Sequence, residues 1–210
     1  MPRVFMFDFD GVIADSLDVF YVEFSAAVRS LGYKKLDSRD ALLKLFEGNV
    51  IAQLIKEGFP VWKLKKLGKT FAPQIAEASM NIEPFPGMPK LINRLAREHP
   101  LYIITSNTTE AVEAALDRFG IEGVCDVLGA DKESSKVKKI KKVRKRYRGH
   151  TPWYIGDTKG DMLEGNSAGA RTIGVTWGWH SESTLLEGDP DHLVQDQKEL
   201  RKLLLAPREN

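Results

Sequence analysis

Residues 4–16 read Val-Phe-Met-Phe-Asp-Phe-Asp-Gly-Val-Ile-Ala-Asp-Ser, and this stretch decides the predicted fold. Its first four residues are apolar, which predicts a buried strand too short to cross a membrane. Asp8 and Asp10 follow where that strand ends, and Gly11 permits a tight turn whose N–H groups can approach a ligand. Two such carboxylates repel each other unless a cation or a shared proton is present. The stretch therefore predicts a metal site, an acid/base pair or both, against the alternative of a plain surface turn.

The composition is typical of a globular protein with one domain, or one domain and a small companion. The chain has 210 residues, of which 42% are hydrophobic and 29% charged, and its net charge is only +2. This small net charge gives no electrostatic reason to expect nucleic acid or a membrane as a partner. The single cysteine, Cys125, excludes an internal disulfide and lies in an apolar run, so we expect it in the core. The start of the chain lacks the pattern of a signal peptide, and we expect a cytoplasmic protein.

Residues 16–83 show helical periodicity and no convincing strand. The first predicted helix runs from residue 17 until Gly32 ends it, and the second follows N-cap candidates at 37–40 and runs through Phe46. Two more are predicted from 50 to 57 and from 60 or 61 toward Met80. The stiff segment Pro84-Phe85-Pro86-Gly87 follows this block. We interpret the block as a helical domain, residues 16–83, inserted into a second domain made of residues 1–15 and 84–210.

After residue 87, strands and helices alternate. Strands are predicted at 101–104, 125–129, 152–155 and 171–175, with helices at 88–97, 110–119, 136–147, 162–168 and 200–205. This alternation predicts the α/β class, with a mostly parallel sheet covered on both faces.

Two polar segments outside the opening stretch could hold an anion. Ser106 and Asn107 follow a predicted strand and precede a helix, whose free N–H groups favour anions, although both residue types are also ordinary N-caps. Lys136 begins a basic helix and could offer a point charge to a phosphate. Lys132, Lys138 and Lys139 lie nearby, so the sequence leaves open which lysine does so.

Two more carboxylates, Asp157 and Asp161, follow the apolar strand at 152–155. A pair at this position is hard to explain as solvated surface. Hard oxygen ligands gathered from distant segments suit Mg²⁺, which keeps several waters and shares a substrate phosphate. Combined with Asp8, Asp10 and the anion-binding segments, the pair predicts a site for phosphoryl transfer.

These four clusters, in this order, resemble the motifs of the haloacid dehalogenase-like (HAD) superfamily, and the resemblance covers essentially the whole chain. The first motif is Asp8-Phe9-Asp10-Gly11-Val12, with Asp15-Ser16 after it. The helical block resembles the cap of the phosphoglycolate phosphatase and β-phosphoglucomutase branch, and residues 84–87 resemble the exit from that cap. The resemblance implies a Rossmann-like parallel core with a small inserted α-helical cap.

The resemblance also implies a role for each site residue. Asp8 would be the nucleophile that forms an aspartyl-phosphate, and Asp10 would be the acid for the leaving group and then the base for water. Ser106, helped by Asn107, would hold the phosphoryl group, and Lys136 would neutralise it.

The metal expected by the same resemblance is Mg²⁺. It would be bound by the Asp8 carboxylate, the Asp10 carbonyl and Asp157, with Asp161 supporting the site. In the cap, Glu47-Gly48-Asn49 resembles a substrate-specificity loop, so Glu47 and Asn49 are candidates for that role, although a plain turn between helices explains the segment equally well.

We therefore expect a Mg²⁺-dependent phosphatase that acts on a small phosphorylated metabolite, as a monomer or homodimer and without a membrane partner. A phosphomutase of the β-phosphoglucomutase type is the alternative on the same scaffold. A dehalogenase is disfavoured because such enzymes lack the aspartate that Asp10 supplies. A non-catalytic protein that binds through the basic helix 136–148 is a further alternative, but Tyr147 is the single aromatic residue among its charges, and the absence of a pattern of interleaved aromatic residues disfavours nucleic acid.

Overall fold

The computed structural model describes residues 1–206, apart from the side chains of residues 72, 73 and 76. The chain folds into two compact units, each of which makes most of its contacts within itself. The core unit contains Met1–Asp15 and the chain from Glu83 onward, and the helical unit is Ser16–Ile82. The chain leaves the core unit after Asp15 and re-enters it at Glu83. These two points are adjacent, because the N–H of Asp15 donates to the carbonyl of Glu83 at 2.9 Å.

The core unit is built on a six-stranded sheet in the order β3-β2-β1-β4-β5-β6, with every pairing parallel. Its strands are β1 (Arg3–Phe7), β2 (Leu101–Ile104), β3 (Asp126–Leu128), β4 (Thr151–Gly156), β5 (Arg171–Val175) and β6 (His192–Val194). The opening strand β1 is central, since Phe7 pairs with Ile103 of β2 on one side and with Ile155 of β4 on the other. The residues that follow these three strands therefore share one rim of the sheet, where open α/β sheets place their ligands.

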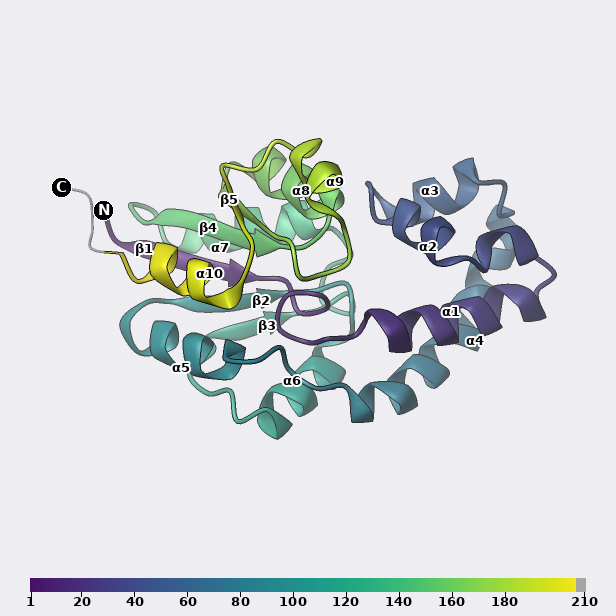
Figure 1. Cartoon of the computed structure of the whole chain (residues 1–210), viewed down its shortest axis with the longest axis horizontal. Helices are drawn as coiled ribbons and strands as arrows, with labels where there is room; N and C mark the ends of the chain where they lie inside the picture. Colours follow the sequence, from purple (N-terminus) through teal and green to yellow (C-terminus); the bar gives the residue numbers. More distant parts are fainter. Residues whose placement is uncertain (207–210) are drawn as a thin grey trace. The chain divides into compact units, whose positions relative to one another are not determined.

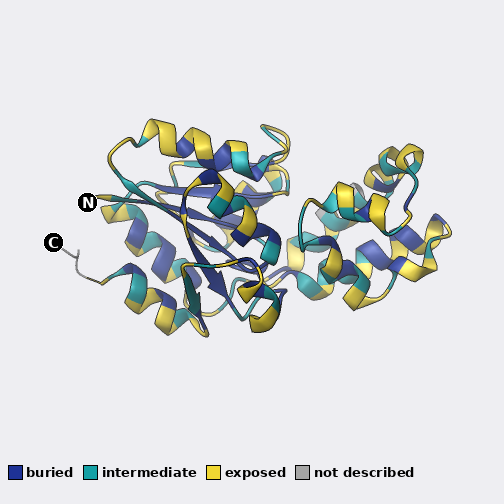
Figure 2. Ribbon diagram, turned by 90° about the horizontal axis from the view of Figure 1, so that it is seen from above, coloured by how far each residue is buried: buried dark blue, intermediate teal, exposed yellow. Residues whose placement is uncertain are grey.

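Helices cover both faces of this sheet, as the alternation predicted (Figure 1). They are α5 (Met88–Glu98), α6 (Thr109–Arg118), α7 (Lys136–Arg146), α8 (Lys159–Ala168), α9 (Glu182–Leu186) and α10 (Gln197–Leu204). Val4 and Met6 of β1 pack with Ile140 and Val143 of α7 on one face. Because side chains alternate along a strand, Phe5 and Phe7 point to the other face, where both are fully buried. The helices turn their exposed sides outward (Figure 2).

Several local features differ from the sequence-based expectation, among them the start of α10 at Gln197 in place of 200. Helix α8 begins at Lys159 rather than 162, because the side chains of Thr158 and Asp161 form a reciprocal capping box at its start. The short elements α9 and β6 follow residue 175, where no strand was expected. The expectation that Cys125 is a core residue is wrong: β3 begins one residue later and the thiol is exposed.

The helical unit contains α1 (Leu17–Ser30), α2 (Arg39–Leu45), α3 (Val50–Lys56) and α4 (Val61–Ala78), with 3₁₀ turns at Lys34–Leu36 and Ser79–Asn81. Phe24, Leu42, Leu54 and Phe59 are among the apolar residues that give it a core of its own. None of the helices in the described part of the chain is long and apolar enough to cross a membrane.

Asn49, a candidate for substrate specificity, lies at the start of α3. Its Oδ1 accepts a hydrogen bond from the N–H of Ala52 at 3.1 Å, so the side chain is the N-cap of the helix. The cap gives Asn49 a structural role at the turn between α2 and α3. The alternative that this segment is a plain turn between helices needs no more than such a role. A role of Glu47 and Asn49 in choosing a substrate stays a prediction.

Candidate active site

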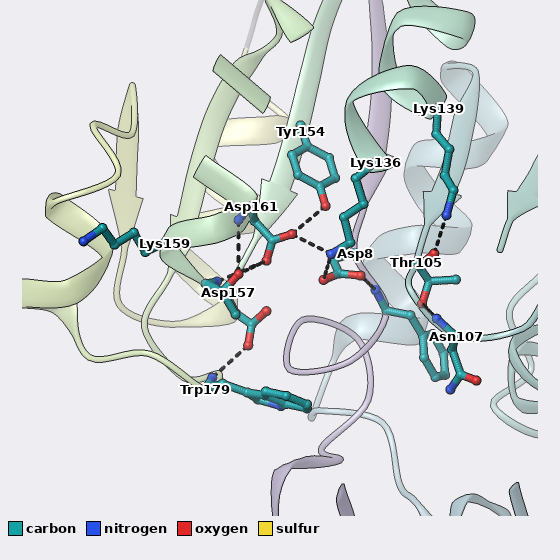
Figure 3. A network of polar contacts seen from close by, with 12 residues as sticks. Asp8, Thr105, Asn107, Lys136, Lys139, Tyr154, Asp157, Lys159, Asp161 and Trp179 are labelled. Atoms are coloured by element: carbon teal, nitrogen blue, oxygen red, sulfur yellow. Dashed lines mark hydrogen bonds and ion pairs between the residues drawn. The ribbon is translucent and has the colours of Figure 1, made fainter. Parts of the chain in front are cut away.

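Asp8 occupies the centre of the site, directly after the central strand, and only 6% of its surface is exposed. Its backbone N–H donates to the carbonyl of Ile155 on β4 at 2.8 Å, which continues the sheet ladder by one residue. Its Oδ1 accepts from the N–H of Phe9 at 2.8 Å, and its Oδ2 accepts from Nζ of Lys136 at 2.6 Å. The carboxylate is thus fixed in direction and paired with a cation (Figure 3).

Lys136 is the lysine whose ammonium reaches Asp8 and Asp161. Its ammonium lies 2.6 Å from Asp8 Oδ2 and 2.6 Å from Asp161 Oδ1, and bridges the two. Lys132 instead contacts Asp126 and the carbonyl of Val127, away from Asp8. Of the lysines considered, Lys136 is thus the one paired with Asp8, and its contact with a phosphate stays a prediction.

Asp161 uses both carboxylate oxygens within the protein. Its Oδ1 accepts from Lys136 and from the hydroxyl of Tyr154 at 2.8 Å, and its Oδ2 accepts from Oγ1 and N–H of Thr158 at 2.6 and 3.2 Å. Asp161 therefore holds Lys136 and the start of α8 in place. Sequence reasoning missed Tyr154 and Thr158, although the spacing Thr158-x-x-Asp161 before a helix was a signal for the second.

Asp157 is completely buried, and only one of its oxygens has a partner. Its Oδ2 accepts from the N–H of Trp179 at 2.8 Å, whereas Oδ1 is buried without a hydrogen bond. The backbone of Gly11 and Gly178 closes around this carboxylate. A Cβ on Gly11, whose φ is +75°, would lie 1.9 Å from Asp157 Oδ2, and one on Gly178 would lie 2.3 Å from Asp157 Cβ. Both positions therefore require glycine.

The three buried carboxylates fit a cation. One oxygen from each of Asp8, Asp157 and Asp161 lies within 4.8 Å of the others. Up to three negative charges here face the single ammonium of Lys136, and the buried Oδ1 of Asp157 has no donor. Burying a polar oxygen or an uncompensated charge is costly unless a partner is supplied. A divalent cation with a preference for hard oxygen ligands would supply both the charge and the partner.

The pKa values of these groups follow from the same crowding. Burial raises the pKa of Asp8 from 3.8 to about 8, and burial with the nearby carboxylates raises that of Asp157 well above its ordinary value. Burial opposes the charge of Lys136 as well, but Asp161 and Asp8 overcome it and raise its pKa. Burial likewise opposes the ionised form of Asp161, yet Lys136 holds the pKa of that carboxyl below its usual range.

This pattern predicts how stability of the metal-free protein changes with pH. Because the pKa of Asp8 is raised to about 8 in the folded state, the folded chain holds a proton there that the unfolded chain releases above about pH 4. The free energy of unfolding should then fall as pH rises between those values. Melting in a chelator from pH 5 to 8 should show a shallower fall for Asp8→Asn than for the wild type. Asp117→Asn, at an exposed site, is the control, and an Asp8→Asn slope equal to that of the control would contradict the prediction.

The predicted anion-binding segment lies at the end of the neighbouring strand β2. Ser106 is exposed there, and Oδ1 of Asn107 accepts from the N–H of Thr108 at 2.8 Å. The N-cap of α6 is Thr108, so the alternative that Ser106 or Asn107 caps this helix is wrong. Asp10 lies in the turn after Asp8, where its backbone bridges to Ala14. The structure thus brings Ser106, Asn107, Asp8 and Asp10 to the same rim.

Comparison with known proteins identifies the class. The model of the haloacid dehalogenase-like hydrolase family matches residues 5–175, and the chain belongs to this family. Curated relatives include the phosphoglycolate phosphatase of Synechococcus elongatus, 27% identical over 203 residues that span 94% of this chain and 95% of the relative. The probable phosphatase IndB of Dickeya dadantii is 26% identical over 95% of this chain and 92% of its own length. The predicted class of enzyme, a HAD-like phosphatase, is thereby confirmed.

Solved structures share the fold. A predicted phosphatase from Clostridium acetobutylicum superposes with a TM-score of 0.84 at 18% identity, covering 99% of this chain and 100% of that one. A HAD-like family protein from Streptococcus pneumoniae superposes with a TM-score of 0.80 at 22% identity, covering 95% and 96%. The predicted fold class, a Rossmann-like parallel core, is confirmed.

Proposed function

We propose that this protein is a Mg²⁺-dependent phosphatase that hydrolyses a small phosphorylated metabolite through an aspartyl-phosphate on Asp8. One observation carries the proposal: the buried Asp8 carboxylate lies at the end of the central strand, 2.6 Å from Lys136, within a cluster of three carboxylates whose charge this one ammonium offsets only in part. Curated relatives bear the name phosphoglycolate phosphatase, which makes 2-phosphoglycolate the first substrate to test.

In the first step, a carboxylate oxygen of Asp8 would attack phosphorus and the bond to the leaving alcohol would break. Asp10 would give its proton to that alcohol. In the second step, Asp10 would take a proton from water as the water oxygen attacks phosphorus, which releases phosphate and restores Asp8. Two displacements replace one difficult hydrolysis, and Lys136 offsets charge that would otherwise repel the nucleophile.

The residues that would hold Mg²⁺ are Asp8, Asp157 and the backbone carbonyl of Asp10. When bound, the ion would supply electrostatic stabilisation to the transferring phosphoryl group. The four donors on Asp161 favour a supporting role for that residue over direct ligation. A supporting role at the metal site is also what the family resemblance implied for Asp161.

The helical unit is proposed to act as the cap, inserted between Asp15 and Glu83. Its separate apolar core supports a unit that keeps its own structure. We propose a cytoplasmic enzyme, monomeric or homodimeric, whose cap selects the substrate, with Glu47 and Asn49 as candidates. Exchanging Glu47 for glutamine should then alter relative kcat/KM across substrates and leave turnover of p-nitrophenyl phosphate within about twofold.

The proposal predicts metal-dependent phosphate release. In Mg²⁺ we expect turnover of at least one of 2-phosphoglycolate, sugar phosphates, nucleotides and p-nitrophenyl phosphate. In excess chelator the rate of phosphate release should fall by at least about 100-fold, because several kcal/mol of charge stabilisation would be removed. Adding Mg²⁺ back should restore the rate. Turnover that is equal with chelator would contradict the metal dependence. No release from any substrate by the folded, Mg²⁺-loaded protein would contradict the phosphatase assignment, and sugar-phosphate isomerisation would then test for a mutase.

A further inference from the structure

A second lysine of α7, Lys139, is buried more completely than Lys136, and the proposed reaction does not use it. Its relative exposure is 1%, against 8% for Lys136. Its Nζ donates a hydrogen bond of 2.7 Å to the backbone carbonyl of Thr105, at the end of β2. Figure 3 shows the side chain reaching from α7 to that carbonyl, beside the segment that carries Asn107.

The segment that Lys139 contacts is held from three directions. The N–H of Thr105 donates to the carbonyl of Leu128 on β3 at 3.2 Å, and its Oγ1 accepts from the N–H of Asn107 at 3.0 Å. Its carbonyl accepts from Lys139. Thr105 is itself fully buried, so this anchor lies inside the protein while Ser106, the next residue, is exposed at the rim.

The carbonyl of Thr105 belongs to the peptide group that contains the N–H of Ser106. A trans peptide is planar, and its C=O and N–H point in opposite directions. The described peptide bonds of the chain are all trans. An ammonium that fixes the carbonyl therefore also fixes the direction of the Ser106 N–H, away from Lys139. It also polarises the peptide, which strengthens that N–H as a donor.

We propose that Lys139 is a positioning residue of the phosphatase, which acts through the Thr105–Ser106 peptide to aim the Ser106 N–H at the phosphoryl group. The inference rests on the proposed function, because it assumes that the segment after β2 binds phosphate. In this proposal Lys139 does not touch the substrate. Its charge acts on the phosphoryl group through the Thr105–Ser106 peptide group.

Packing alone does not account for a lysine at this position. A buried ammonium is costly, and a neutral carbonyl compensates it only in part. Burial and the charge of Lys136 lower the pKa of Lys139 to about 8, while the carboxylates of Asp8, Glu133 and Glu164 act in the opposite sense. A methionine of similar volume would fill the same space without that cost. A structural role and a positioning role therefore predict different behaviour for Lys139→Met.

The experiment compares Lys139→Met with Lys142→Met, a matched change at an exposed lysine of the same helix. We expect Lys139→Met to lose about ten- to hundredfold in kcat/KM for p-nitrophenyl phosphate, the range for one hydrogen bond to a charged group. Inhibition by inorganic phosphate should weaken by about tenfold. Its Tm should equal or exceed that of the wild type. Lys142→Met should stay within about twofold, and Lys139→Arg, which keeps the charge, should recover part of the loss.

Wild-type kcat/KM and phosphate inhibition in Lys139→Met would overturn the inference. A lower Tm with unchanged phosphate inhibition would overturn it too, because that result describes a structural residue. If Lys139→Met does not fold, Lys139→Gln is judged by the same criteria, since its shorter neutral side chain removes the charge. A wild type without turnover would instead overturn the proposed function, so the two failures are distinguishable.

Discussion

Asp8→Asn is expected to remove phosphatase turnover, with kcat lowered by at least about 10⁴-fold. The amide has almost the same shape as the carboxylate, and its Oδ1 can still accept from the N–H of Phe9. It is not a nucleophile toward a phosphate ester, however, so the covalent step is lost. The measurement is steady-state release of phosphate in saturating Mg²⁺ from the wild type and the variant.

The same variant should remain folded. It removes one of three crowded carboxylates, so the Tm in chelator should equal or exceed that of the wild type. Asp117→Asn, at an exposed site of the core unit, should keep wild-type turnover. An Asp8→Asn protein that retains more than about a tenth of wild-type kcat would contradict the role of Asp8, since nucleophile removal costs far more.

Asp157→Asn is expected to have the second-largest effect, on the use of Mg²⁺. Among the described residues, the Oδ1 of Asp157 is the buried carboxylate oxygen without a donor, and we propose it as a metal ligand. An amide in its place supplies less negative charge. The Mg²⁺ concentration for half-maximal activity should rise by at least about 100-fold, more than the 10- to 100-fold typical of residues that only support a ligand. Titration of activity and of Tm with Mg²⁺ measures this shift.

Asp161→Asn provides the comparison that separates a ligand from a supporting residue. Its oxygens are filled by Lys136, Tyr154 and Thr158, so its loss should lower kcat through Lys136 and change the Mg²⁺ requirement less than Asp157→Asn does. Equal shifts in half-maximal Mg²⁺ for the two variants would contradict the distinction.

The sheet and the order of the site segments could be predicted because each depends on local pattern. An apolar run followed by polar residues marks the carboxyl end of a buried strand, and parallel strands bring those ends to one rim. The short elements α9 and β6 were not predictable in this way, because five and three residues carry too little periodicity. Cys125 was misassigned for a related reason: one residue decides whether a side chain lies inside a strand or before it.

The partners within the site could not be predicted, because they depend on how elements pack. The basic sequence of α7 does not indicate which of its lysines are buried. The helix packs on the sheet through Ile140 and Val143, and this orientation places Lys136 and Lys139 in the interior. Tyr154 meets Asp161 only because α8 starts beside the end of β4. The N–H of Trp179 comes from a loop 22 residues after Asp157 and has no sequence signal of its own.

The most direct test of the account is to look for the phosphoryl group on Asp8. The enzyme would be mixed with Mg²⁺ and p-nitrophenyl phosphate, quenched in acid during turnover, digested and analysed by mass spectrometry. Asp10→Asn should enrich the adduct, because this substrate has a good leaving group that needs no acid, whereas water attack needs a base. We expect phosphate on the peptide that contains Asp8, and we expect it to disappear once the substrate is exhausted. Turnover with no adduct on that peptide in either protein, or an adduct on another residue, would contradict this expectation.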